Sequence, residues 1–292
     1  MFVITGGLGQ TGRAVAQALL AQGEKVRLMV CRDGPDAEAL RRKGADIVRA
    51  DLADTVALRR AFAGASGAYL MNPPAYHSPD LFARAREVHA ALVGAAVEAR
   101  VAHVVALSSI GAQHSSGIGN ILTTHDLETR LRTAELCATV LRAPTFMENF
   151  GWLLRPVLER SVLPTMLLPV SVRHPMASAR DIGQVAAALL RQPPEHSRIV
   201  EMHGPAEYSA EDAATVFSAC LGRPVHCVEV AREDWAGVFA SAGYPEVTIA
   251  AFCEMYDAFN GGAIRFEGGH GTARGTTTLD TVIARLLESA AS

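Results

Sequence analysis

The chain has 292 residues, of which 49% are hydrophobic, enough for one large α/β domain or for a domain with an appended lobe. Its formal net charge of -3 and its pI near 6.4 give no electrostatic reason to expect binding to nucleic acid or to an anionic membrane. The histidines occur singly, without an H-x-x-x-H or comparable pair, so we expect no metal site.

The five cysteines are scattered and include no C-x-x-C pair, which predicts reduced, mostly buried thiols. A strand begins directly at the N-terminus and leaves no room for a signal peptide, and no apolar run reaches membrane-spanning length. We therefore expect a cytoplasmic protein with no membrane partner. The sequence leaves the oligomeric state open, because it shows no heptad pattern.

The N-terminal stretch predicts a strand, a glycine turn and a helix in direct succession. Phe2 to Ile4 is an apolar run typical of a buried strand, and Arg13 to Gln22 is helix-forming. Between them the chain reads Thr5-Gly6-Gly7-Leu8-Gly9-Gln10-Thr11-Gly12. Glycines there permit a tight turn and close approach of the backbone to a pyrophosphate, which would lie on the helix N-terminus. A glycine-rich turn without a ligand is the alternative.

The second expected strand, Lys25 to Val30, ends at Cys31, Arg32 and Asp33. In a dinucleotide-binding fold this strand end meets the adenosine ribose, where an arginine pairs with a 2′-phosphate and a carboxylate accepts from a 2′-hydroxyl. Arg32 therefore favours NADP(H) over NAD(H). Asp33 keeps NAD(H) open as the alternative, with Arg32 then a solvated loop cation.

Strands and helices continue to alternate through the first half of the chain. The expected elements are a helix from Asp36 to Lys43, a strand from Ala45 to Arg49, a helix from Thr55 to Phe62 capped by Asp54, a strand from Ala68 to Met71, a long helix to Ala99 started by Ser78 and Pro79, and a strand from Val101 to Leu107. This alternation predicts an α/β fold with a doubly wound parallel sheet and ligands beyond the carboxyl ends of its strands.

The pattern loosens after a helix from Leu122 to Arg132 and a strand from Thr139 to Arg142. The later expectations are a helix beginning near Asp181, a helix from Ser209 to Leu221 with a capping box in which Asp212 replaces the preferred Glu, a strand from Val225 to Val230, helices from about Asp234 to Ser241 and Glu246 to Phe259, a glycine-rich loop from Gly261 to Gly271, and a helix from Leu279 to Ser289.

Together these pieces resemble the NmrA-like branch of the atypical short-chain dehydrogenases/reductases. The motifs that carry the resemblance are the glycine turn, Val30-Cys31-Arg32, Ala50-Asp51-Leu52, Ser108-Ser109-Ile110-Gly111, Glu128 to Arg132 running into Thr139 to Asn149, and Arg180-Asp181-Ile182-Gly183. The later part, with Ala242-Gly243-Tyr244-Pro245, is similar to bacterial members that reduce quinones, azo dyes or triphenylmethane dyes with NAD(P)H.

The resemblance implies a Rossmann domain over residues 1–150 that binds NADP. It also implies a smaller C-terminal α/β lobe over residues 151–292 that mainly binds substrate, with segments at about 175–202 returning to the Rossmann domain. The expected cofactor residues are Gly6, Gly7, Leu8, Gly9, Gln10, Thr11, Gly12, Arg32, Asp51, Leu52, Met71, Asn72, Pro73, Ser108, Pro144 and Phe146.

The acceptor site should have apolar and aromatic walls on loops that face the crevice. The candidates are Tyr76, His77, Phe150, Trp152, Met166 and His174, together with Phe146. Each of them could instead belong to the core of the lobe.

Many short-chain dehydrogenases use a Tyr-x-x-x-Lys pair, in which the lysine lowers the pKa of a tyrosine that acts as acid or base. This chain has no lysine after Lys43, and the corresponding segment, Thr123 to Glu128, has no tyrosine. A carbonyl-reducing enzyme would need a substitute, for which His125 is the best candidate because histidine titrates near neutral pH. A solvent-facing histidine at a helix start is the alternative.

The sequence supports three hypotheses for the function. The leading hypothesis is an NADPH-dependent oxidoreductase that transfers hydride to a small apolar conjugated acceptor such as a quinone or a dye, because such acceptors need little acid–base help. The second is a non-catalytic NADP-binding redox sensor of the NmrA type. The third is a biosynthetic reductase that uses His125 as acid or base.

Overall fold

The computed structural model describes residues 1–291 and is organised around one central parallel sheet. The strands lie in the order β3-β2-β1-β4-β5-β6-β10-β13, and each recorded pairing among them is parallel. Their bounds are β1 (Phe2–Ile4), β2 (Val26–Val30), β3 (Asp46–Arg49), β4 (Gly67–Leu70), β5 (Val104–Ser109), β6 (Ala138–Ala143), β10 (Arg198–His203) and β13 (Gly271–Arg274). The order reverses between β1 and β4, which places a topological switch point beside the glycine turn.

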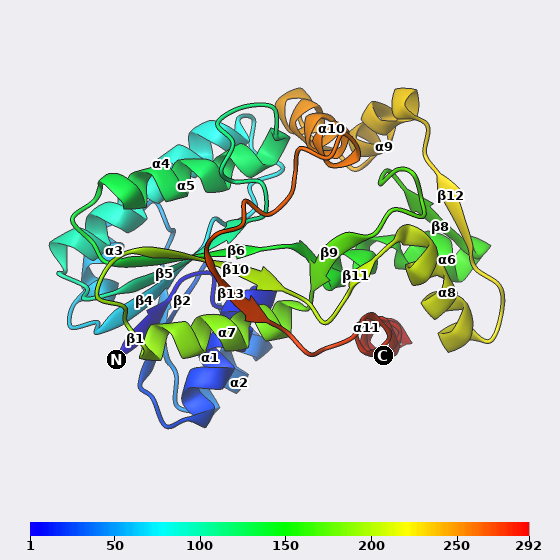
Figure 1. Cartoon of the computed structure of the whole chain (residues 1–292). Coiled ribbons are helices and arrows are strands. Elements are labelled where there is room, and N and C mark those ends of the chain that lie inside the picture. The colour runs from blue at the N-terminus through cyan, green and yellow to red at the C-terminus, as the bar shows by residue number, and fades with distance from the viewer. Residues whose placement is uncertain (292) are drawn as a thin grey trace.

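Helices cover both faces of this sheet (Figure 1). The cluster on one face includes α3 (Thr55–Phe62), α4 (Leu81–Glu98) and α5 (Leu122–Thr133), and the cluster on the other includes α1 (Gln10–Ala21), α2 (Pro35–Arg42) and α7 (Ala179–Arg191). With both faces covered, β4 and β6 are buried at every position, as is typical of parallel strands. The predicted doubly wound Rossmann sheet is confirmed.

The smaller C-terminal lobe combines two small sheets with short helices. Its strands are β7 (Thr145–Phe146), β8 (Val162–Thr165), β9 (His174–Ala177), β11 (Glu207–Tyr208) and β12 (His226–Glu229); its helices are α6 (Leu154–Arg160), α8 (Ala210–Leu221), α9 (Trp235–Ser241), α10 (Glu246–Asn260) and α11 (Leu279–Ala291), with short 3-10 turns η2 (Met147–Leu153) and η3 (Arg232–Asp234). A third 3-10 turn, η1 (Gly119–Ile121), lies in the connection between β5 and α5. Its main core joins α6, α8 and α11. The predicted α/β lobe is therefore confirmed.

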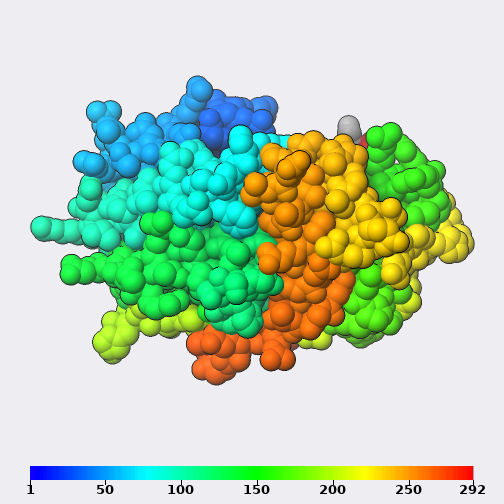
Figure 2. Space-filling model, turned by 90° about the horizontal axis from the view of Figure 1, so that it is seen from above, coloured from blue at the N-terminus to red at the C-terminus, as the bar shows by residue number. Residues whose placement is uncertain are grey.

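Helix α10 packs against the segment that connects β5 to α5. Ile110 and Ile118 from this segment are buried together with Ala258 of α10 and with Ile264. The approach is so close that a Cβ added to Gly119 would lie 1.9 Å from the carbonyl oxygen of Ala251. Seen from above in Figure 2, α10 in orange lies directly against the α4 and α5 surface. The lobe is thus held beside the carboxyl edge of the sheet.

Several helix starts follow the predicted capping chemistry, and one does not. Asp54 accepts the N–H groups of Val56 and Ala57, and the Ser209 capping box forms both bonds although its acid is the shorter Asp212. The prediction that Ser78 and Pro79 start α4 is wrong. Asp80 caps that helix, because its carboxylate reaches the N–H groups of Phe82 and Ala83.

Two further expectations are corrected by the structure. The predicted glycine-rich loop extends to His270, and an edge strand that the sequence did not predict, β13, follows it and pairs with β10 over Gly271 to Arg274. This strand has no alternating apolar pattern, so its stability comes from pairing rather than from side-chain packing. The cysteines are also less buried than predicted: Cys31 and Cys220 are exposed, Cys137 and Cys227 are half-buried, and Cys253 alone is buried.

None of the helices within residues 1–291 combines the length and the apolar composition needed to cross a membrane.

A buried carboxylate connects α7 to the chain that follows β13. Asp181 Oδ2 accepts the N–H groups of Thr276 and Thr277, each at 2.7 Å, and Oδ1 accepts the Thr277 hydroxyl at 2.6 Å. We expect Asp181→Ala to lower the free energy of unfolding by about 3 kcal/mol, because these donors lose their acceptor. Chemical denaturation would measure the loss, with exposed Asp280→Ala as the control; equal losses in the two variants would contradict this role.

Candidate functional site

The glycine turn between β1 and α1 leaves no room for side chains. A Cβ added to Gly12 would lie 2.4 Å from the Gly6 carbonyl oxygen, and one added to Gly7 would lie 2.2 Å from Cγ of Leu28. Gly6 has a φ of 61°, a left-handed conformation that glycine adopts readily. The helix start that follows offers its first N–H groups, which have no acceptor within the helix. This arrangement suits an anion such as a pyrophosphate.

Two buried side chains hold the turn against the end of β4. Thr5 Oγ1 donates to the Tyr69 carbonyl at 2.9 Å and accepts the Met71 N–H at 3.1 Å. The Tyr69 hydroxyl donates to Thr11 Oγ1 at 2.9 Å, and its side chain is completely buried. Burial raises the pKa of Tyr69 well above its usual value, so the phenol remains a neutral donor. Side-chain hydrogen bonds therefore fasten the turn to the end of β4.

The end of β2 presents an unpaired cation. Arg32 is exposed, and among residues 1–291 the structure records no ion pair for it. Close by in sequence, Asp36 of α2 is bound by Arg13, with Nη2 to Oδ2 at 2.7 Å. Arg13 Nη2 also donates to the Leu8 carbonyl of the glycine turn at 3.2 Å. Arg13 thus joins the glycine turn to the β2–α2 connection that contains Arg32.

The residues after β3 are ordered by local hydrogen bonds. Asp51 Oδ1 accepts the Ala53 N–H at 2.9 Å and pairs with Arg84 of α4 at 2.5 Å. The Ala53 bond is the main cause of a lowered pKa of Asp51, with Arg84 adding to it. Leu52 is half-buried against the core on the α4 face.

The residues after β4 are half-buried beside the glycine turn. The Met71 side chain lies against Gly6, since a Cβ on Gly6 would approach its sulfur to 2.6 Å. Asn72 is bound through both ends of its amide, to Thr123 of α5 and to His89 of α4. Pro73 follows at the same edge. The structure therefore brings Met71 and Asn72 together with the turn.

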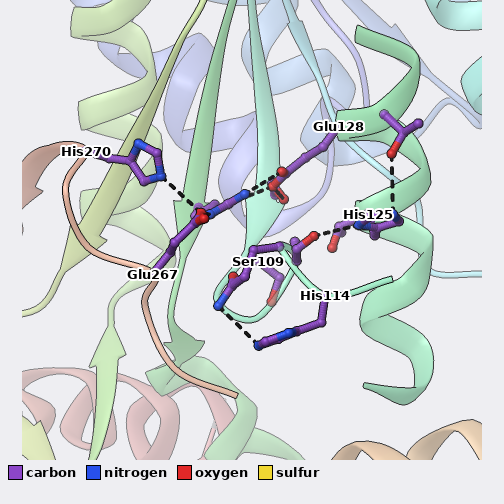
Figure 3. A network of polar contacts seen from close by, with 12 residues as sticks. Ser109, His114, His125, Glu128, Glu267 and His270 are labelled. Carbon is purple, nitrogen blue, oxygen red and sulfur yellow. Dashed lines mark hydrogen bonds and ion pairs between the residues drawn. The ribbon is translucent and has the colours of Figure 1, made fainter. Parts of the chain in front are cut away.

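Ser108 lies at this edge, but its hydroxyl is bound inside the protein. Its Oγ donates to Glu128 of α5 at 2.5 Å, and Glu128 accepts two bonds from Arg142 at 2.9 and 2.8 Å. Arg142 also binds Glu267, which binds His270 at 3.0 Å (Figure 3). Arg142 and Glu128 are each 3% exposed. Neither the Ser108 hydroxyl nor the Glu128 carboxylate is free for a ligand in this arrangement.

His125 is half-buried on the first half of α5. Its Nδ1 lies 2.8 Å from the Ala112 carbonyl, so this nitrogen carries a proton. Nε2 lies 3.4 Å from Thr129 Oγ1, and Figure 3 shows the ring between the β5–α5 segment and its own helix. Nε2 points along the helix toward Thr129 rather than toward the glycine turn.

Beyond β6, Pro144 is buried and Phe146 is half-buried against the core of the α1 face. Phe146 pairs with Ala177 between β7 and β9, and Glu148 accepts the Ala179 N–H at 2.8 Å. Burial raises the pKa of Glu148, chiefly through loss of solvation. These bonds connect the end of β6 to the start of α7.

Tyr76 and His77 belong to an aromatic cluster that joins the chain after β4 to α9 and α10. Tyr76 packs edge-on against Phe252 and Tyr244, at centroid distances of 4.9 and 6.0 Å. His77 is exposed and lies 5.0 Å from the Tyr244 ring. The stacked rings of Phe239 and Phe252 complete the cluster. Both candidates thus hold the lobe against the sheet domain.

The other acceptor candidates are dispersed. Phe150 packs edge-on against Phe217 in the core of the lobe, and Met166, 8% exposed, is buried with Trp235. Trp152 is 66% exposed. His174 is 8% exposed, lies edge-on to Phe259, and has a buried Nε2 without a hydrogen-bond partner among residues 1–291. Burial lowers the pKa of His174, so a neutral imidazole is favoured.

No cluster of three or more His, Cys, Asp or Glu side chains within residues 1–291 is arranged to hold a metal ion.

Sequence reasoning missed Arg13 and His89. Arg13 directly follows the last glycine of the turn, and a cation at that position indicates a contact with the turn. His89 lies within a long apolar helix, where one histidine reads as a surface residue. Only the packing of α4 on α5 reveals that it is completely buried and bound to Asp126 and Asn72.

The doubly wound parallel sheet and its glycine turn define a Rossmann-type α/β protein. More narrowly, the chain belongs to the NmrA-like family, whose model matches residues 1–284.

The comparisons also identify named relatives. The NAD(P)H azoreductase of Xenophilus azovorans is 26% identical over 256 residues, which cover 88% of this chain and 86% of that protein. The triphenylmethane reductase of Citrobacter sp., solved with NADP(H), superimposes with a TM-score of 0.80 at 22% identity, covering 98% of this chain and 99% of that one. An NADPH-dependent quinone oxidoreductase of Escherichia coli, solved with NADPH, also gives 0.80 at 22% identity, covering 98% and 100%. These two structures establish a shared fold.

The contact between Gly12 and Gly6 gives a direct test of the turn. We expect Gly12→Ala to weaken dinucleotide binding by at least about tenfold, because the added methyl group must displace the Gly6 carbonyl. Calorimetric titration with NADPH would measure the change. Gly94→Ala is the control, since a Cβ at Gly94 in α4 meets nothing within 4 Å. Unchanged affinity in Gly12→Ala would contradict the placement of the pyrophosphate.

Proposed function

We propose that the protein is an NADPH-dependent oxidoreductase that transfers hydride to a small apolar conjugated acceptor, quinone-like or dye-like. The observation that carries the proposal is the set of groups at the carboxyl edge of the sheet. The glycine turn at this edge suits an anion. Helix α5, in contrast, supplies no tyrosine–lysine pair, and its Glu128 is already bound by Arg142. The related azoreductase and the similar dye and quinone reductase folds support it.

The cofactor would lie along this edge from β2 to β6. Its pyrophosphate would sit on the residues from Gly6 to Gly12, and Arg32 would meet the 2′-phosphate, with Asp51 and Leu52 near the adenine. The nicotinamide would lie near Met71, Asn72 and Pro73 and the residues Ser108, Pro144 and Phe146. Because Ser108 Oγ binds Glu128, the backbone at Ser108 would make the contact. When bound, NADPH supplies the hydride.

The acceptor would bind between the nicotinamide and the lobe, over residues 151–292. Quinones and conjugated dyes accept hydride into low-lying orbitals and take their proton from water or a weak donor, so positioning carries most of the catalysis. The apolar side chains of Phe146, Tyr76 and the α10 region suit this role.

The proposal is tested by mixing purified protein with NADPH and a panel of quinones, azo dyes, triphenylmethane dyes and enones, and following the loss of reduced nicotinamide absorbance. Turnover with conjugated acceptors, and none with simple aldehydes or ketones, is the expected result. Tight NADPH binding without any turnover would instead favour the redox sensor. Turnover of a simple carbonyl that is abolished in His125→Ala would favour the biosynthetic reductase.

Cofactor choice gives a separate prediction at Arg32. Arg32→Ala should raise the Kd of NADPH by roughly tenfold or more and leave that of NADH nearly unchanged, because only NADPH carries the 2′-phosphate. Titration calorimetry with both nucleotides measures the ratio. Arg132→Ala is the matched control, since Arg132 is an exposed arginine in the last turn of α5 at the opposite sheet edge. An unchanged NADPH to NADH ratio would remove Arg32 from the phosphate site.

A further inference from the structure

A buried histidine connects the segment after β4 to two helices. His89 of α4 is completely buried, with Nε2 3.0 Å from Asn72 Oδ1 and Nδ1 2.8 Å from Asp126 Oδ2. The Asn72 amide nitrogen donates to Thr123 Oγ1 at 2.9 Å, and that hydroxyl donates to the Asn120 carbonyl at 2.8 Å. The hydrogen bonds thus run without interruption from α5, through α4, to the residue after Met71 and back to α5.

The donors and acceptors in this hydrogen-bond network determine which atoms carry protons. The Thr123 hydroxyl has one proton, which it gives to the Asn120 carbonyl, so it must accept from the Asn72 amide nitrogen. The opposite amide orientation would set two oxygens 2.9 Å apart with no proton between them. Asn72 Oδ1 therefore faces His89, and Nε2 of His89 must carry a proton to bind it.

The second ring nitrogen, Nδ1, lies 2.8 Å from the Asp126 carboxylate, so it must carry a proton as well, and in this arrangement the ring is an imidazolium paired with Asp126. Asp126 Oδ2 also accepts Arg130 Nε at 2.8 Å, so His89 and Arg130 share one acceptor. Burial is the main influence on the pKa of His89 and lowers it, so the doubly protonated ring depends on the Asp126 carboxylate, which opposes this effect. A cavity of about 330 Å³ lined in part by Asp80, Arg86, Thr123 and Asp126 opens beside the network and gives solvent a route to the Asp126 carboxylate.

We infer that His89 is a positioning residue for the proposed reductase. Its Nε2–H holds the amide of Asn72 in one orientation. Asn72, which would border the nicotinamide, is thereby bound to Thr123 in the first turn of α5. Asp126 sets the ring orientation of His89. The same turn contains Thr123 and leads to His125, so the network couples the two segments that would border the reacting end of the cofactor. The inference rests on the proposed function for its kinetic readout.

A matched pair of substitutions separates this role from simple packing. His89→Gln places an amide nitrogen near the position of Nε2 and keeps a donor for Asn72, whereas His89→Asn places one near Nδ1 and keeps a donor only for Asp126. We expect His89→Asn to lower kcat/KM for a quinone by roughly tenfold or more and His89→Gln to retain activity within about threefold. The Kd of NADPH should stay nearly unchanged in both, because the adenosine and pyrophosphate contacts lie elsewhere.

Imidazole nitrogen chemical shifts provide a readout that needs no turnover. In the ligand-free wild-type protein at neutral pH, His89, assigned by its absence in His89→Gln, should show a protonated Nε2. An unprotonated Nε2, or kinetic losses that are equal in the two variants and follow their melting temperatures, would overturn the inference. A wild-type protein that turns over no acceptor would count against the reductase itself, and the nitrogen shifts would still decide the role of His89.

Discussion

The guanidinium of Arg142 holds together the carboxyl edge of the sheet on which the proposed site depends. It lies at the end of β6, binds Glu128 of α5 through two nitrogens, and uses the third for Glu267 in the segment that leads to β13. Its bonds are also the main reason for the lowered pKa of Glu267. Removing either partner of the buried Arg142–Glu128 pair would strand a charge, at a cost of about 3–5 kcal/mol. One side chain therefore connects the sheet, a helix and the final strand.

This use of α5 limits the chemistry that the edge can perform. The helix that in many short-chain dehydrogenases carries a tyrosine and a lysine here supplies a carboxylate to a structural ion pair, and the hydroxyl of Ser108 is bound to the same carboxylate. The oxygens of this carboxylate already accept from a guanidinium and a hydroxyl, so they are not free to contact a substrate. Near the proposed nicotinamide position the structure offers mainly backbone, the Asn72 amide and apolar side chains. This limit is the reason for proposing an acceptor that needs little proton transfer from the protein.

The sequence predicted the parts of the molecule that local rules control. Alternating apolar runs and caps such as Asp54 and Ser209 located most strands and helices, and the glycine pattern predicted the tight turn between β1 and α1. Ser78 was predicted to start α4, but Asp80 satisfies the same capping rule and is the residue that caps the helix. The strand β13 was missed because its four residues, Gly271 to Arg274, show no apolar alternation. The bonds of His89 to Asn72 and Asp126 join residues that only the packing of α4 on α5 brings together.

The parallel arrangement of the central sheet determines on which side of the protein the amine groups lie. Every pairing in the central sheet is parallel, so all strands begin at one edge and the glycine turn lies at the other. The lysine side chains of the sequence, at Lys25 and Lys43, each precede the start of a strand and so lie at or near the starting edge. Attachment to a solid support through amines would therefore hold the molecule in one orientation, with the edge that carries the glycine turn directed away from the support and open to solutes.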